Sequence, residues 1–269
     1  MIKTAILGAA LATALAGCAT TTSPTGRNQY AAVSDAELNQ LGAQAFAEYK
    51  AKLPQSTNAT QTRYVQCVVN SIVNQLPAEY RNTGWETALF QDNQANAFAL
   101  PGGKVGVYTG IFKVATNQDQ LAAVVAHEIG HVVARHHNER VSRQMASQQL
   151  VNVLGAVVGS RYGEGAGQIA QVLGGAGAQG LFVLPNSRTQ ETEADVVGQQ
   201  LMAKAGFDPR QAVNLWQNMI SSQGSSRGPE WMSTHPDPAN RITELRSRAD
   251  GLVPTYQAAQ KAGIRPRCG

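Results

Sequence analysis

Two histidines with a glutamate beside the first are the residues of this chain best suited to chemistry. His127 and His131 are four positions apart, so on a helix both imidazoles share one face and can reach one metal ion. Two neutral imidazoles suit zinc, and they leave two tetrahedral positions for a third protein ligand and a water. Glu128 would lie over the open position and could take the proton of that water. The spacing therefore indicates a catalytic metal site.

An acidic segment sixty residues after His131 offers a third ligand. Glu191 and Asp195 are again four positions apart and face the same way on a helix. Glu191 could complete the zinc shell, and Asp195 could accept the free N–H of a liganding histidine and so fix its tautomer. Glu193 lies about 200° around the same helix from Glu191, so we expect it to face water.

The histidine segment and the acidic segment are each preceded by residues that typically start a helix. Asn117 and Gln120 form a capping-box pattern before the first helix, and Ser187 and Gln190 form another before the second. The first helix also carries a broad apolar stripe, which favours packing against a core. The stripe consists of Leu121, Val124, Val125, Ile129, Val132 and Val133.

The remaining elements indicate an α+β fold. Two amphipathic helices are expected over 34–52 and 60–76, and Pro77 ends the second. Three strands are expected over 85–90, 97–100 and 105–108, the last two joined by a turn at 101–103. Helices dominate the rest of the sequence, so we expect a small sheet beside the two metal-binding helices.

Three motifs in order resemble metallopeptidase family forty-eight. They are the H-E-x-x-H segment, E-x-E-A-D at 191–195, and His235-Pro-Asp-Pro followed by Arg241. The resemblance covers residues 30 to 250 or so and is greatest to the bacterial periplasmic lipoprotein proteases that survey outer-membrane β-barrel assembly. It implies a predominantly helical, gluzincin-like fold with an edge strand beside the H-E-x-x-H helix.

The site residues implied by this resemblance are those that match the family's motifs. One Zn²⁺ per chain is expected on His127, His131 and Glu191, with Glu128 as the catalytic glutamate. His235 matches a family histidine near the end of the catalytic core. It could steady the developing oxyanion, fill the fourth zinc position as a plug, or merely pack.

In the resembled family the segment 96–108 lies at the rim of the cleft. Asn96, Ala97 and Phe98 could then present a strand edge with which an extended substrate peptide pairs. A hairpin with a purely structural role is the alternative.

The first eighteen residues read as an export signal. Lys3 precedes an apolar stretch over 5–16, and Leu-Ala-Gly-Cys18 resembles the bacterial lipobox, in which the cysteine is lipidated. A short membrane anchor is the alternative, but about a dozen apolar residues do not span a bilayer of roughly 30 Å. Ala19, rather than Asp, follows the cysteine, and by resemblance to enterobacterial lipoprotein sorting signals this favours the outer membrane. The expected regions are a signal peptide (1–17), a lipidated tether (18–30), a metallopeptidase domain (31–250) and a C-terminal tail (251–269).

Charge and cysteine content limit the partners and the compartment. Without residues 1–17, which hold one lysine and no acidic residue, the net charge falls from +4 to +3, too little to argue for nucleic acid. With Cys18 lipidated, Cys67 and Cys268 remain as a pair in an oxidising periplasm. We expect a disulfide that fixes the tail to an early helix; two unrelated buried thiols are the alternative.

Several other residues receive an ordinary structural interpretation. His136 and His137 fall off the four-residue grid of the first motif, so we expect them to be solvated. Trp216 and Trp231 are expected in the core. The Gly- and Ala-rich segment 150–184 is too polar for a spanning helix and fits either a lid or close helix packing.

Together these features predict a zinc endopeptidase, anchored by lipid to the periplasmic face of the outer membrane. Misfolded or stalled envelope proteins are the expected substrates, and the β-barrel assembly machinery is a possible partner, both through the resemblance alone. The membrane is expected to be touched only through the lipid. The alternative function is a non-proteolytic adaptor or chaperone that binds extended segments in the same cleft.

Overall fold

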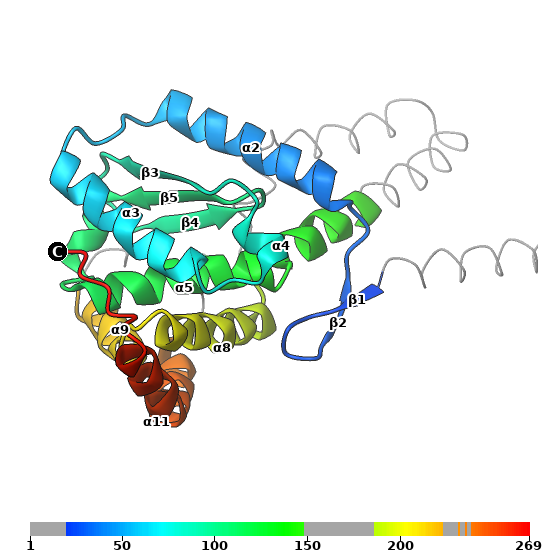
Figure 1. Cartoon of the computed structure of the whole chain (residues 1–269). Coiled ribbons are helices and arrows are strands. Elements are labelled where there is room, and N and C mark those ends of the chain that lie inside the picture. Colours follow the sequence, from blue (N-terminus) through cyan, green and yellow to red (C-terminus); the bar gives the residue numbers. More distant parts are fainter. Residues whose placement is uncertain (1–19, 148–185, 223–230, 232–234, 236–237) are drawn as a thin grey trace, which may run out of the picture.

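The computed structural model describes residues 20–147, 186–222, 231, 235 and 238–269. A three-stranded sheet lies between helix α2 on one face and helices α3 and α5 on the other, and α8, α9 and α11 pack beyond α5 (Figure 1). The structure is mostly helical with small sheets, so the expected α+β class is confirmed.

The sheet contains β3 (Glu86–Phe90), β4 (Ala97–Leu100) and β5 (Lys104–Tyr108) in the order β3-β5-β4. β5 runs parallel to β3 and antiparallel to β4, and Gly102 and Gly103 turn the chain between β4 and β5 with positive φ. Because successive side chains alternate between faces, Phe90 packs under α2, whereas Leu89 faces the larger core on the other side. The three expected strands are therefore present, and β4 is an edge strand.

The two early helices begin where the sequence predicts. α2 (Asp35–Lys52) starts at Ser34, whose side chain accepts from the backbone N–H of Glu37 in a capping box. α3 (Ala59–Val73) starts at Asn58 and buries the apolar stripe of the second expected helix. Its buried residues are Val65, Val68, Val69, Ile72 and Val73.

The helices that carry the two motifs pack against each other. They are α5 (Gln118–Val133), capped by Asn117, and α8 (Arg188–Lys204), capped by Ser187. Two glycines allow the backbones to meet: a Cβ at Gly130 would lie 2.8 Å from the Ala194 carbonyl oxygen, and one at Gly198 would lie 3.0 Å from the His127 nitrogen. This close approach lets side chains of α5 and α8 converge on one point.

The C-terminal part covers the far side of α8. After α9 (Gln211–Ser221), helix α11 (Pro238–Lys261) runs through the domain boundary expected at residue 250. In the sequence, the short helix α4 (Ala78–Arg81) precedes the strands of the sheet, and the 3₁₀ turn η1 (Thr109–Lys113) follows them. The tail ends against α3, where Cys67 and Cys268 form a disulfide. The expected pairing of these two cysteines is thereby confirmed.

The described part of the expected lipidated tether (18–30) is folded against the domain. Residues 20–30 form a hairpin in which β1 (Thr20–Thr22) pairs antiparallel with β2 (Asn28–Tyr30). Its polar side chains bind buried groups of the domain, so they are held by partners that the sequence alone does not reveal. Cys18 and the segment 150–184 lie outside the described residues.

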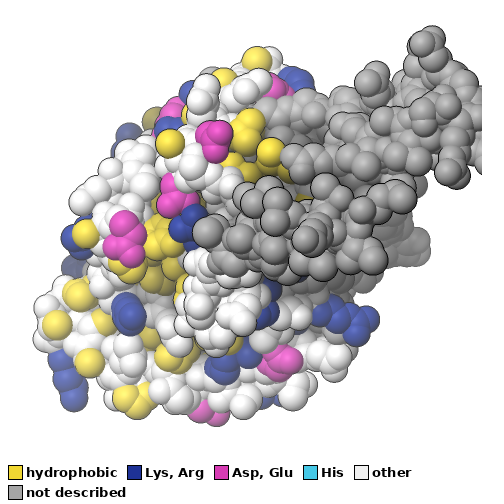
Figure 2. Space-filling model, turned by 90° about the vertical axis from the view of Figure 1, so that its right-hand side faces the viewer, with side chains coloured by type: hydrophobic (Ala, Val, Ile, Leu, Met, Phe, Trp, Pro, Cys, Tyr) yellow, Lys and Arg dark blue, Asp and Glu magenta, His cyan; other side chains and the backbone are white. Residues whose placement is uncertain are grey.

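Among the described residues, none of the helices is long and apolar enough to cross a membrane. Basic and acidic side chains are interspersed over the coloured part of the face in Figure 2. All five histidines are buried, and no histidine shows there among the described side chains. The charge on this face is thus mixed, whereas the titratable rings are gathered inside.

Candidate active site

Four buried side chains from three parts of the chain meet in one cluster: His127 and His131 on α5, Glu191 on α8, and His235. One ligand atom of each lies within 4.8 Å of the others. The Nε2 atoms of the two α5 histidines are 3.1 Å apart, and each is 3.4 Å from a Glu191 oxygen. Two ligands at 2.0–2.1 Å from one tetrahedral zinc would be separated by about 3.3 Å. The spacing therefore fits a bound divalent cation.

The charges in the cluster agree with this fit. Oε1 of Glu191 is buried and has no hydrogen-bond partner among the described residues. Burial raises the pKa of Glu191, but the neighbouring His235, His127 and His131 outweigh it and hold the pKa well below its usual range. A buried carboxylate oxygen without a donor is costly unless it binds a cation. Glu191 thus has the ionisation and the vacant lone pairs of a metal ligand.

The three rings differ in their protonation. Burial lowers the pKa of His131 and of His235, which keeps both neutral as metal ligation requires. Burial and Arg241 also lower the pKa of His127, but Asp195 and Glu191 outweigh them and raise it to about 9. Binding of a cation by His127 would therefore release a proton.

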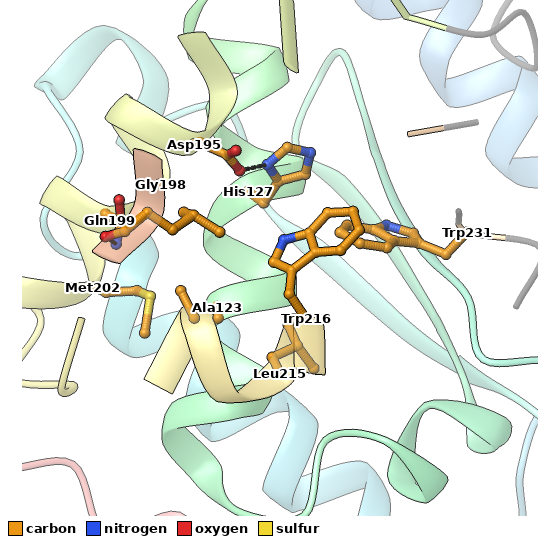
Figure 3. A pocket seen from close by; sticks show the side chains of 11 residues that line it. Ala123, His127, Asp195, Gly198, Gln199, Met202, Leu215, Trp216 and Trp231 are labelled. Atoms are coloured by element: carbon orange, nitrogen blue, oxygen red, sulfur yellow. Dashed lines mark hydrogen bonds and ion pairs between the residues drawn. The ribbon is translucent and has the colours of Figure 1, made fainter. Parts of the chain in front are cut away.

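Asp195 lies where the sequence predicts, against the other nitrogen of His127. Its Oδ1 is 2.9 Å from His127 Nδ1 (Figure 3). Arg241 donates to both Asp195 oxygens at 2.7 and 2.8 Å, and to Glu191 Oε2 at 2.6 Å. Its guanidinium stacks 4.2 Å over the Trp216 ring. Arg241, which belongs to the third motif, thus orients two carboxylates: Asp195, which lies behind the ligand His127, and Glu191, which belongs to the cluster.

Glu128 is held by a tryptophan that the sequence places only in the core. Trp231 is buried as expected, and its Nε1–H also donates to Glu128 Oε1 at 2.7 Å. The Trp231 carbonyl is 2.8 Å from His235 Nδ1, and the two rings stack with centroids 4.4 Å apart. His235 Nε2 lies 3.4 Å from the same Glu128 oxygen. Trp231 therefore fixes both the expected base and the expected fourth ring.

The rear of the site is closed by apolar side chains. Behind His127, Trp216 and Trp231 lie side by side with ring centroids 5.0 Å apart (Figure 3). The space they leave with Met202 and Leu215 is a cavity of ≈ 10 Å³, about the room for one water. The electrostatic interactions of Asp195 and His127 are therefore little screened by solvent.

Three residues expected in water are buried, and those predictions are wrong. His136 and His137 are 0% and 5% exposed, and Glu193 is 4% exposed. The four-residue grid assumed one continuous helix, but the chain turns after α5 at Arg135, where φ is 56°, and a new helix runs over 136–147. His136 therefore returns to His131, and Glu193, on the far side of α8, meets the N-terminal hairpin instead of water. A non-glycine residue with positive φ has no reliable sequence signal.

The expected substrate strand is the edge strand β4, preceded by Asn96, whose carbonyl accepts from the Tyr108 N–H at 3.0 Å. Ala97 is buried, and Phe98 stacks on Tyr49 with ring centroids 4.3 Å apart, on the side of the sheet that faces α2. A peptide could therefore use the backbone of this segment but not the Phe98 ring. Peptide binding there stays a prediction.

The comparisons with known proteins agree with these motifs. Residues 59–249 match Peptidase family M48. The chain is 36% identical over 203 residues to the mitochondrial metalloendopeptidase OMA1 of Schizosaccharomyces pombe. The aligned segment covers 75% of this chain and 57% of that relative. It is 32% identical over 237 residues to the Beta-barrel assembly-enhancing protease of Yersinia pestis (87% and 46%) and 30% over 248 residues to that of Escherichia coli (91% and 50%).

The chain spans about half the length of the curated relatives it matches. The matched region contains all three motifs and the whole cluster of possible ligands. The family expected from the motifs is thus confirmed, and this chain is a metallopeptidase of peptidase family M48.

Proposed function

We propose that this chain is a zinc endopeptidase whose metal is held by His127, His131 and Glu191. The observation that carries the proposal is the convergence of these three donors at 3.1–3.4 Å, with Glu128 on the same helix as the two histidines. Nitrogen and carboxylate ligands in this number are typical of catalytic zinc, which keeps one position open.

The bound zinc would supply Lewis-acid chemistry, since it polarises the scissile carbonyl and makes water acidic near neutral pH. Glu128 accepts the proton of the attacking water and passes it to the leaving nitrogen. The Trp231 N–H, 2.7 Å from Glu128 Oε1, holds the carboxylate in one orientation during both transfers. Asp195 keeps His127 in the tautomer that presents Nε2 to the metal.

His235 occupies the fourth corner of the cluster in this geometry. A ring in that place competes with the water that peptide hydrolysis needs. We expect His235→Ala to raise kcat, because the position becomes available to water, and we expect zinc content to stay unchanged. Turnover of casein at fixed zinc measures this. A fall in kcat of about 10²-fold to 10³-fold would instead identify His235 as an oxyanion donor, and an unchanged kcat would leave it a packing residue.

The location we propose is the bacterial envelope, with the chain anchored by lipid on Cys18. The lipobox-like sequence supports it, as do the relatives called Beta-barrel assembly-enhancing protease. Similarity to mitochondrial OMA1 proteins is of the same order, so the address depends on the N-terminal sequence rather than on the family.

Removing the lipidation site tests this address. We expect Cys18→Ser to accumulate as an uncleaved or soluble form, because lipid is then no longer attached. Fractionation of cells that express the variant and the parent chain, with detection of both forms on a gel, measures the change. Cys67→Ser, which removes a cysteine of the disulfide, is the matched control and should still fractionate with membranes. Membrane association of Cys18→Ser after signal removal would contradict the lipid anchor.

The substrates we propose are misfolded or stalled envelope proteins, which expose extended segments that can pair with the edge of β4. The β-barrel assembly machinery is the proposed partner, from the names of the bacterial relatives. Cleavage of unfolded casein, with zinc counted in the same sample, tests the function. A chain that holds zinc and binds casein but leaves it intact would favour the adaptor.

A further inference from the structure

His131 and His127 are supported by different partners. If Nε2 of His131 binds a metal, its remaining proton is on Nδ1, which lies 2.7 Å from Nδ1 of His136. His136 Nδ1 must then accept a hydrogen bond from the His131 Nδ1–H, so the proton of His136 is on Nε2, 3.2 Å from Glu193 Oε2. The geometry thus fixes the tautomers of both rings. We call these three residues the His131–His136–Glu193 network.

The N-terminal hairpin completes this network. Arg27 Nε donates to Glu193 Oε2 at 2.7 Å, and the hydroxyls of Ser23 and Thr25 donate to Glu193 Oε1. A guanidinium and two hydroxyl donors on its oxygens are the partners that an ionised carboxylate takes. Glu193 is therefore a carboxylate that attracts the His136 N–H and, through it, polarises His131.

Arg27 is also anchored on a second carboxylate. Its two terminal nitrogens donate to the two oxygens of Glu139, both at 2.9 Å. Glu139 is buried on the helix over 136–147, the same helix that begins with His136. One guanidinium thus bridges the hairpin, α8 and the helix after α5.

The turn at Arg135 makes the contact possible. In an uninterrupted helix residue 136 would lie about 140° around the axis from residue 131, too far for the two rings to meet. The left-handed conformation of Arg135, which also pairs with Asp35, starts a new helix in a different direction. His136 is therefore brought to His131 by a local conformation that is uncommon for a residue with a side chain.

The support of His131 resembles that of His127, except that a second imidazole ring lies between His131 and its carboxylate. His127 meets the carboxylate Asp195 directly, and Arg241 holds that carboxylate. His131 meets Glu193 through His136, and Arg27 holds that carboxylate, from 166 residues earlier in the chain. Partners behind metal-binding histidines fix ring orientation and raise ligand basicity.

We propose that His136 and Arg27 are positioning residues for the metal, so that docking of the hairpin β1–β2 raises the affinity of the His127–His131–Glu191 site for zinc. This inference rests on the proposed zinc site. Arg27 and Glu193 act on the metal only through His136 and His131. A displaced hairpin would leave all metal ligands in the chain but weaken the binding of the ion.

Measuring the zinc affinity of variants tests the proposal. Arg27 and Arg143 serve as a matched pair, because both contact Glu139. Arg27→Gln removes the cation that contacts both Glu139 and Glu193. Arg143→Gln removes the other cation on Glu139, 2.5 Å from its Oε1. The Arg143 side chain is 58% exposed, and its carboxylate partner among the described residues is Glu139 rather than Glu193. Both changes are made in full-length chains that carry Glu128→Gln, which prevents self-cleavage, and zinc is titrated against a chromophoric chelator.

We expect Arg27→Gln to raise the zinc Kd about 10-fold, whereas Arg143→Gln should leave it unchanged. His136→Phe, which keeps a ring but removes both hydrogen bonds, should raise it by about 10-fold to 100-fold, the range for partners behind a ligand. In zinc-loaded protein the His131 Nδ1 proton should give a hydrogen-bonded NMR signal that His136→Phe loses. A merely structural role would lower the melting temperature of the metal-free variants without changing the Kd of the folded protein.

The remaining outcomes are also decisive. Wild-type zinc affinity in folded Arg27→Gln overturns the proposal, and it does so even if His136→Phe fails to fold. Equal weakening by Arg27→Gln and Arg143→Gln overturns it as well, because Glu139 would then be the only carboxylate that matters. If the Glu128→Gln parent binds no zinc, the proposed zinc site itself is wrong, which separates that failure from failure of the network.

Discussion

Glu128→Gln should keep its zinc and its fold but lose casein cleavage by at least 10²-fold to 10⁴-fold, the contribution of a general base. Glutamine has the shape of glutamate, and its amide oxygen can still accept from the Trp231 N–H that now lies 2.7 Å from Glu128 Oε1. It cannot take a proton from water. Initial rates of casein cleavage, with zinc content and melting temperature measured on the same samples, give the comparison.

A carboxylate far from the site supplies the control for this change. Glu48 lies on α2 and approaches Lys52 at 3.8 Å, so Glu48→Gln removes the same charge with no contact to the cluster. Its rate should equal that of the parent chain. Cleavage by Glu128→Gln near the parental rate would remove the role of Glu128 as the base.

Glu191→Ala should abolish zinc binding and activity together, because no other carboxylate of the described residues belongs to the cluster. Arg241 keeps its two bonds to Asp195, so the helices α8 and α11 should stay joined after the change. Metal analysis after dialysis, with circular dichroism to confirm the fold, measures the effect. Retention of a full zinc by Glu191→Ala would show that another group is the third ligand.

The neighbouring glutamate is the matched comparison. Glu193→Ala removes a buried carboxylate from the same helix, two residues away, but that carboxylate faces His136 and the hairpin. It should weaken zinc binding without abolishing it. Complete loss of zinc from Glu193→Ala, with retention by Glu191→Ala, would mean that the ligand has been assigned to the wrong face of α8.

The elements whose signals are local could be predicted from the sequence. Ser34, Asn117 and Ser187 begin helices because their side chains accept from the backbone N–H three residues later, an interaction that depends only on neighbours. The i and i+4 spacing likewise brings His127 and His131 together whatever surrounds the helix. The three strands and the paired cysteines follow from alternation and from an even count.

The support of the site could not be predicted in the same way. His136 lies against His131 only because Arg135 adopts a left-handed conformation, and its neighbours contain neither glycine nor proline at the break. Residues 20–30 have the composition of a linker. The serine and arginine that bind Glu193 are residue types that are equally common in solvent-exposed linkers, so composition does not reveal their partner. The bond from Trp231 to Glu128 joins residues 103 positions apart. Each of these contacts depends on tertiary structure.

The disulfide between Cys67 and Cys268 has a consequence for a protease that can meet other copies of itself. It closes a covalent ring over 201 positions of sequence, and that ring contains every residue of the metal cluster together with Glu128, Asp195 and Arg241. In the chain-entropy description a ring of this size disfavours the unfolded state by roughly 5 kcal/mol. A single break of the backbone anywhere inside it yields no separate fragments, so the nicked molecule remains one covalent body with all its site residues attached.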